Sequence, residues 1–76
     1  MTRLTALELA TNYPDNILIT SYSNEGKFGI LCYMTRNGEI HKLMISSEPV
    51  YESKEKAEET MHNIIKNVLN DLEKYF

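Results

Sequence analysis

The sequence predicts a small α+β domain with the order α-β-β-β-α, in which a three-stranded antiparallel sheet carries a long C-terminal helix on one face. The first observation behind this prediction is segment 53–76, whose apolar residues recur at the three- and four-residue steps of one helix face. The second is segment 17–46, which is rich in β-branched and aromatic residues and is divided by turn sequences. A chain of 76 residues supports a single domain with one modest core.

A short helix is predicted near the N-terminus, over residues 4–12. Thr5 and Glu8 have the spacing of a capping box, in which two side chains satisfy backbone N–H groups of the first turn. Segment 13–16 (Tyr-Pro-Asp-Asn) ends the helix, because proline disfavours a helical residue before it and Asp and Asn favour turns. The apolar residues expected to face a core are Leu4, Leu7, and Ala10 or Leu9.

Three strands are predicted next, over residues 17–22, 28–35 and 39–46, with the first turn at 23–26. Between the last two strands, Asn37-Gly38 is a strong hairpin signal, because these residues accept the positive φ angles of a type I′ turn. With this two-residue loop, an uninterrupted register is expected. Its pairs are Arg36–Glu39, Thr35–Ile40, Met34–His41, Tyr33–Lys42, Cys32–Leu43 and Leu31–Met44.

Side chains alternate between the two faces of a strand, so this register assigns each residue to a face. One face is almost entirely apolar and is expected to lie beneath the C-terminal helix. Its members are Phe28, Ile30, Cys32, Met34, His41, Leu43 and Ile45.

The opposite face of the predicted sheet is more apolar than a solvated face usually is. Its members are Leu31, Tyr33, Ile40, Lys42 and Met44, with Leu18 or Tyr22 beside them. This face is either covered by the N-terminal helix, bound by a partner, or simply partly exposed. Much folded surface is apolar in any case, but contiguous apolar patches on small domains tend to mark contacts. Terminal aromatic residues likewise either complete a core or contact a partner. The candidate partner surface comprises Leu31, Tyr33, Ile40, Met44, Leu69, Tyr75 and Phe76.

The last helix is predicted over residues 53–75. Ser53 stands at the N-cap position, and Glu55, Glu58 and Glu59 place negative charge near the positive end of the helix dipole. Its apolar stripe, which is expected to cover the sheet, consists of Ala57, Met61, Ile64, Ile65, Val68, Leu69, Leu72 and Tyr75.

The distribution of charge argues against a nucleic-acid-binding protein. The net charge is −3, from 8 basic and 11 acidic residues. Residues 48–76 carry four lysines against six glutamates and one aspartate. No face is therefore expected to have the concentrated positive charge that drives binding to a phosphate backbone.

The cellular compartment is predicted from cysteine usage and from the N-terminal residues. Cys32 is the only cysteine, so the chain cannot close an internal disulfide, which favours a reducing cytosol. No apolar run approaches the roughly 20 residues needed to span a bilayer. The first residues lack the cationic start and apolar stretch of a signal peptide. We therefore expect a soluble cytoplasmic protein with no membrane association.

Few residues are candidates for catalysis. Cys32 and His41 fall on the same predicted face of neighbouring strands, where a thiolate–imidazole pair or half of a metal site is conceivable. Both residue types also pack as ordinary structural residues, and that interpretation is favoured. None of the three glycines stands in a phosphate-binding spacing. We predict no enzymatic activity, no cofactor and no metal site.

The α-β-β-β-α order, with Ser53-Lys54-x-x-Ala57 at the start of the last helix, resembles the double-stranded-RNA-binding domain. The resemblance implies phosphate contacts at this helix start, where that family places a lysine cluster. Lys54 matches, whereas Glu55 and Glu58 stand where further lysines would be expected, and carboxylates repel phosphates. An alternative nucleic-acid interface would combine stacking tyrosines on the sheet face with cations. Its contacts would be Tyr22, Lys27, Tyr33, Arg36, Lys42 and Lys54.

These observations together predict a small accessory or regulatory protein that binds another protein or a second copy of itself. A nucleic-acid-binding module that uses the sheet face or the start of the last helix is the alternative.

Overall fold

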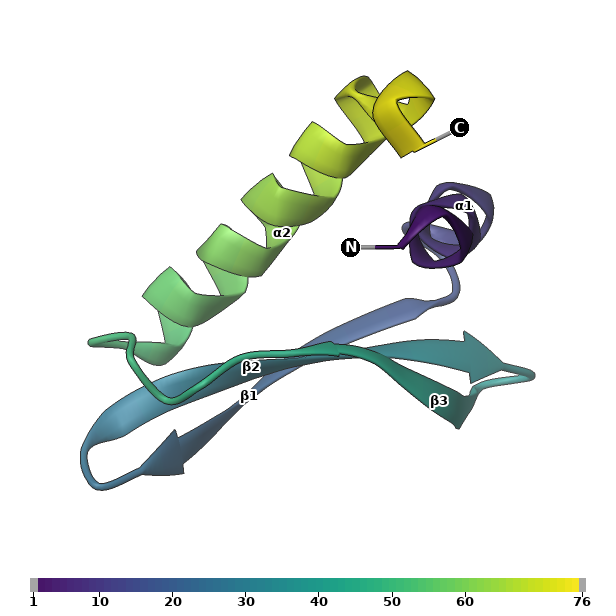
Figure 1. Cartoon of the computed structure of the whole chain (residues 1–76). Coiled ribbons are helices and arrows are strands. Elements are labelled where there is room, and N and C mark those ends of the chain that lie inside the picture. The colour runs from purple at the N-terminus through teal and green to yellow at the C-terminus, as the bar shows by residue number, and fades with distance from the viewer. Residues whose placement is uncertain (1, 76) are drawn as a thin grey trace.

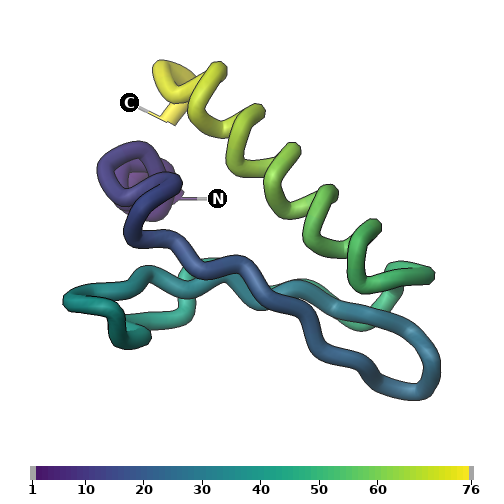
Figure 2. The backbone as a smooth tube through the Cα atoms, turned by 180° about the vertical axis from the view of Figure 1, so that it is seen from behind, coloured from purple at the N-terminus to yellow at the C-terminus, as the bar shows by residue number. Residues whose placement is uncertain are grey.

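A computed structural model describes residues 2–75 and shows an α+β fold of two helices packed on one antiparallel sheet (Figure 1). The strands are hydrogen-bonded in the order β1-β2-β3. Both helices lie on the same side of the sheet (Figures 1 and 2), so the N-terminal helix does not cover the second face. The elements are α1 (Arg3–Asn12), β1 (Ile17–Asn24), β2 (Lys27–Arg36), β3 (Glu39–Ser46), α2 (Lys54–Asn70) and the short 3₁₀-helix η1 (Leu72–Tyr75).

Two tight hairpins build the sheet. The predicted Asn37-Gly38 loop is confirmed, with φ angles of +54° and +80°, the positive values that a type I′ turn requires. The first turn is shorter than predicted. It consists of Glu25 and Gly26, at φ +52° and +82°, and the flanking strands extend to Asn24 and from Lys27.

The register between β2 and β3 departs from the predicted one after its first two pairs. Arg36 lies opposite Glu39 and Thr35 opposite Ile40, as expected. Two register shifts follow. At the first, His41 has no partner residue on β2, and at the second, Met44 has none. Each shift adds one residue to β3 and moves the following side chains to the other face. The later pairs are therefore Met34–Lys42, Tyr33–Leu43, Cys32–Ile45 and Leu31–Ser46.

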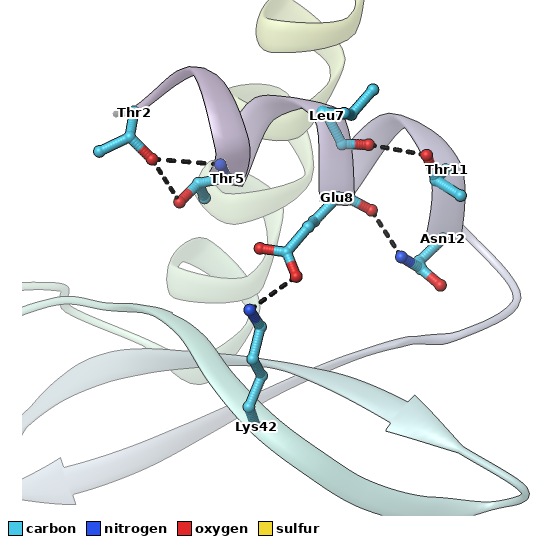
Figure 3. A network of polar contacts seen from close by, with 7 residues as sticks. All are labelled: Thr2, Thr5, Leu7, Glu8, Thr11, Asn12 and Lys42. Carbon is cyan, nitrogen blue, oxygen red and sulfur yellow. Dashed lines mark hydrogen bonds and ion pairs between the residues drawn. The ribbon is translucent and has the colours of Figure 1, made fainter.

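These shifts overturn four of the predicted face assignments. His41 was expected in the core, but it is exposed. Leu43 was expected in the core, but it lies opposite Tyr33 on the outer face and is 50% exposed. Met44 was expected on the outer face, but it packs against the core. Lys42 was also expected there, but it points towards α1 (Figure 3).

Helix α1 begins one turn earlier than its predicted cap. The side-chain oxygen of Thr2 accepts a hydrogen bond from the backbone N–H of Thr5 at 3.1 Å, so Thr2 is the N-cap and the capping box expected from Thr5 and Glu8 is wrong (Figure 3). Glu8 instead forms an ion pair with Lys42 of β3, with 2.6 Å between the carboxylate oxygen and Nζ (Figure 3). This ion pair connects α1 to the edge strand β3.

The face of α1 that enters the core is also different from the predicted one. Ala6 and Leu9 are buried, whereas Leu4 and Leu7 are 64% and 46% exposed. Both buried residues belong to the same core cluster as the buried residues of α2.

Helix α2 supplies the largest share of the core, as its stripe predicts, but Ile64, which was also expected in that stripe, is 37% exposed. Ser53 caps it, accepting a hydrogen bond from the backbone N–H of Lys56 at 3.1 Å. The α-helix ends at Asn70, earlier than predicted, and the chain continues as η1. The core lies between the sheet and both helices, and its buried apolar residues are Ala6, Leu9, Ile30, Cys32, Met34, Ala57, Met61, Ile65 and Val68.

Candidate binding surfaces

The side of the sheet opposite the helices is covered by no element within residues 2–75, and we call it the open face (Figure 1). The strand registers place its side chains in rows that cross all three strands. One row consists of Leu18, Tyr33 and Leu43. Directly opposite residues in antiparallel strands share a face and contact one another, so each row forms a continuous surface.

The apolar patch of the open face is defined by Leu18, Leu31, Tyr33, Ile40 and Leu43. Leu18, Ile40 and Leu43 are 42%, 58% and 50% exposed, and Leu31 and Tyr33 are half-buried. Side chains of this kind on an uncovered sheet face usually signal a contact surface, because a solvated face normally carries polar residues.

At the end of the open face, Tyr22 lies across Gly29, its direct partner on β2. A Cβ added at Gly29 would overlap the Tyr22 ring, so the glycine provides the space in which this ring packs. The Tyr22 hydroxyl donates a hydrogen bond to the backbone carbonyl of Ser47 at 2.5 Å. Gly29 is therefore a point of close packing between β1 and β2.

The candidate partner residues separate into two groups. Leu31, Tyr33 and Ile40 belong to the apolar patch, whereas Leu69 and Tyr75 are partly buried against the core, as is Met44. Phe76 lies outside the described residues. Among the candidate partner residues that the structure describes, the one that is exposed rather than half-buried, Ile40, therefore lies on the sheet. Leu43 was missed as a patch residue, because its position depends on the register shifts in β3.

The candidate nucleic-acid contacts are not brought together. Lys27 and Arg36 stand at opposite ends of β2, and Lys42 points to the helix side, away from Tyr33. Lys27 forms an ion pair with Glu52, with 2.8 Å between Nζ and the carboxylate oxygen. Hydrogen bonding to Lys27 lowers the pKa of the Glu52 carboxyl.

The remaining nucleic-acid candidates also lack the geometry of an interface. The Tyr22 ring already packs over Gly29, and its hydroxyl is bonded to Ser47, so its position suits structural packing better than stacking on a base. Lys54, the first residue of α2, stands beside Glu55 in the first turn of the helix.

We expect the protein not to bind duplex RNA or DNA with micromolar or tighter affinity at physiological salt. Glu55 and Glu58 place negative charge where a helix start would meet phosphates. If only charge prevents binding, the Glu55→Lys/Glu58→Lys variant should gain affinity with a steep salt dependence. A Glu48→Lys/Glu73→Lys variant makes the same change in net charge away from the first turns of α2 and serves as control. Fluorescence anisotropy with labelled duplexes measures both, and tight binding by the unaltered protein would contradict the expectation.

The structure does not bring Cys32 and His41 together, so the conceivable thiolate–imidazole pair is not formed. Cys32 is buried in the core opposite Ile45, whereas His41 is exposed at the first register shift. Burial raises the pKa of the Cys32 thiol to about 11, so very little reactive thiolate exists at neutral pH. Among residues 2–75, no group of three or more His, Cys, Asp or Glu side chains is arranged to hold a metal ion.

A pocket of about 430 Å³ lies between the start of α1 and β3. It is lined by Thr2, Thr5, Met44, Ile45 and Ser46. None of these side chains is ionisable near neutral pH, so the pocket offers hydroxyl groups and apolar surface but no acidic or basic side chain.

Comparison with known proteins gives no relative from which a function follows: the chain matches no protein-family model, no curated protein and no solved structure. No helix within the described part of the chain has both the length and the apolar character needed to cross a bilayer.

Proposed function

We propose that this chain is a small cytosolic accessory or regulatory protein that acts by binding another protein through the open face of its sheet, without catalysis. The observation that carries the proposal is the apolar patch, where leucine, isoleucine and tyrosine side chains lie together on a face that no helix covers within residues 2–75.

The chemistry of the patch supports a protein partner over a charged one. Its five residues are uncharged, and apolar surface gains free energy on burial at about 25 cal/mol per Å². Tyr33 adds a hydroxyl group at the centre of the patch, which suits the mixture of apolar contact and hydrogen bonding found in protein interfaces. A cytosolic location is supported by the single buried Cys32, which has no disulfide partner in the sequence.

The proposal is tested by comparing two double variants in affinity capture from the lysate of the source cell. The Leu18→Glu/Leu43→Glu variant places two charges in the patch. The Leu4→Glu/Leu7→Glu variant places the same charges at similarly exposed leucines on the outer side of α1. A specific partner, identified by mass spectrometry, should be lost from the first variant and kept by the second. Circular dichroism checks that both variants remain folded.

Capture of that partner at equal yield by both variants would contradict the proposal, because the patch would then not be the binding surface. Loss from the α1 variant alone would move the interface to the outer side of α1.

A further inference from the structure

The two edges of the sheet differ in how they are protected against pairing with another strand. The β3 edge contains Glu39 and Lys42 and is interrupted by two register shifts, both of which discourage the addition of a strand. Strand β1 has neither device. Its eight residues contain no charge, no proline and no glycine, and all of them pair with β2 in one continuous register.

The backbone of β1 presents free hydrogen-bonding groups along its outer edge. The Thr35 N–H donates to the Asn16 carbonyl at 2.8 Å, and hydrogen-bonded positions alternate along an antiparallel pair. The N–H and C=O groups of Ile19, Ser21 and Ser23 therefore point away from β2. Within residues 2–75, these outward groups have no hydrogen-bond partner. Figure 2 shows β1 along the near side of the sheet, with no other segment in front of it.

We propose that a second copy of the chain pairs with this edge, so that two β1 strands lie antiparallel about a two-fold axis at Ser21. Ser21 then faces Ser21 of the second copy, and Ile19 faces Ser23 of the second copy, in both directions. Three residue pairs that each exchange two hydrogen bonds satisfy the outward groups of Ile19, Ser21 and Ser23, with about six bonds in total.

An axis at Ser21 is favoured over an axis at Thr20, because it uses only backbone groups that have no hydrogen-bond partner within the described part of one chain. An axis at Thr20 would require the outward N–H of Ile17, which already donates to the Pro14 carbonyl at 3.3 Å. The occupant is a second copy because the edge is compatible with itself. An uncharged strand does not repel its own copy, and small serine side chains meet at the axis.

The resulting dimer contains one six-stranded sheet. Residues opposite each other in an antiparallel pair share a face, so all four helices lie on one side and the two open faces join on the other. The inference goes beyond the proposed function, because it uses the edge of the sheet and not its face. A dimer would nevertheless double the apolar surface offered to a partner protein.

Sedimentation velocity and amide hydrogen exchange, measured over a concentration series up to about 1 mM, test the pairing. We expect a reversible dimer, and the amides of Ile19, Ser21 and Ser23 should exchange more slowly as the protein concentration rises. The amides of Leu18 and Thr20, which face β2, serve as internal references protected at every concentration. A monomer throughout, or a dimer in which the three outward amides stay equally fast, would overturn the proposal.

Charged substitutions at Ser21 test whether the two-fold axis lies at this residue. The Ser21→Lys and Ser21→Glu variants should each dimerise at least about tenfold more weakly, because like charges would face each other. An equimolar mixture should recover the dimer through opposite charges. Failure of the mixture to recover it, with both variants folded, would count against an axis at Ser21.

A second substitution avoids placing a charge near the helices. The Ser23→Pro variant removes one outward N–H per copy and leaves the bonds to β2 in place, so the dimer should weaken by about tenfold or more. The Ser23→Thr variant keeps the N–H and should dimerise normally. The Leu43→Glu variant should also dimerise normally, which separates failure of this proposal from failure of the open-face proposal. An unchanged dimer in Ser23→Pro would contradict pairing at the β1 edge.

Discussion

Replacement of Ile65 by alanine should lower the free energy of unfolding by about 2–5 kcal/mol. Ile65 is fully buried where α2 meets the sheet, and truncation there removes apolar contacts and leaves a cavity that the surrounding residues fill only partly. A protein of 76 residues has about 4–11 kcal/mol of stability in total, so the variant should be close to unfolding at 37 °C. Urea denaturation followed by circular dichroism measures the loss.

The neighbouring residue provides the control. Ile64 is chemically identical but 37% exposed, and it is not among the buried residues of α2. The Ile64→Ala variant should lose less than about 1 kcal/mol, since less surface is removed from burial and alanine favours the helix. Equal losses at the two positions would show that the core stripe of α2 has been assigned wrongly.

Replacement of Gly29 by alanine should cost about 1–3 kcal/mol, although alanine is ordinarily the better residue in a strand. The added methyl group would overlap the Tyr22 ring, which must then move. That movement would also stretch or break the hydrogen bond from the Tyr22 hydroxyl to the Ser47 carbonyl. Chemical denaturation of the variant measures the cost.

A double-mutant cycle isolates the cause. In the Tyr22→Ala background the ring is absent, so Gly29→Ala should be neutral or should stabilise the sheet by up to about 1 kcal/mol. A cost that persists in this background would mean that Gly29 is required for a reason other than the space taken by the ring.

The hairpins were predictable because their determinants are local. Asn37-Gly38 accepts positive φ values that most residues avoid, so the turn and its first two residue pairs follow from the sequence. The later register was not predictable by counting from the turn. Both register shifts occur in β3, where the fit of Ile45 into the core and of Lys42 beneath α1 depends on tertiary contacts.

The orientation of α1 shows a second limit of reasoning from one sequence. Its leucines and alanines are distributed around the helix, so both Leu4–Leu7 and Ala6–Leu9 present an apolar face at helical spacing. Which of the two faces is buried depends on how α1 packs against the rest of the core, and the spacing of apolar residues along one helix does not determine that packing. The long stripe of α2 has no such ambiguity, because its opposite face is charged.

The candidate surface was predictable in part for the same reasons. Leu31 and Tyr33 follow from strand alternation in β2, whose residues are paired on both sides. The open face contains Leu43 where Met44 was predicted, because the register of the edge strand β3 shifts by one residue between the turn and these positions. Whether α1 would cover this face depended on the direction in which the chain leaves the turn before β1, which local sequence preferences do not determine.

Because Cys32 is buried in the core, its thiol can be used to measure local opening of the fold. Since this lone thiol is fully buried and its pKa is raised to about 11, an alkylating reagent in solution reaches it only during rare openings that separate β2 from the helices. The rate at which the reagent labels the unaltered protein, measured by intact mass, therefore reports how readily these openings occur, and no engineered probe is needed. Because the chain has no other sulfhydryl group, every added mass increment is assigned to this one site.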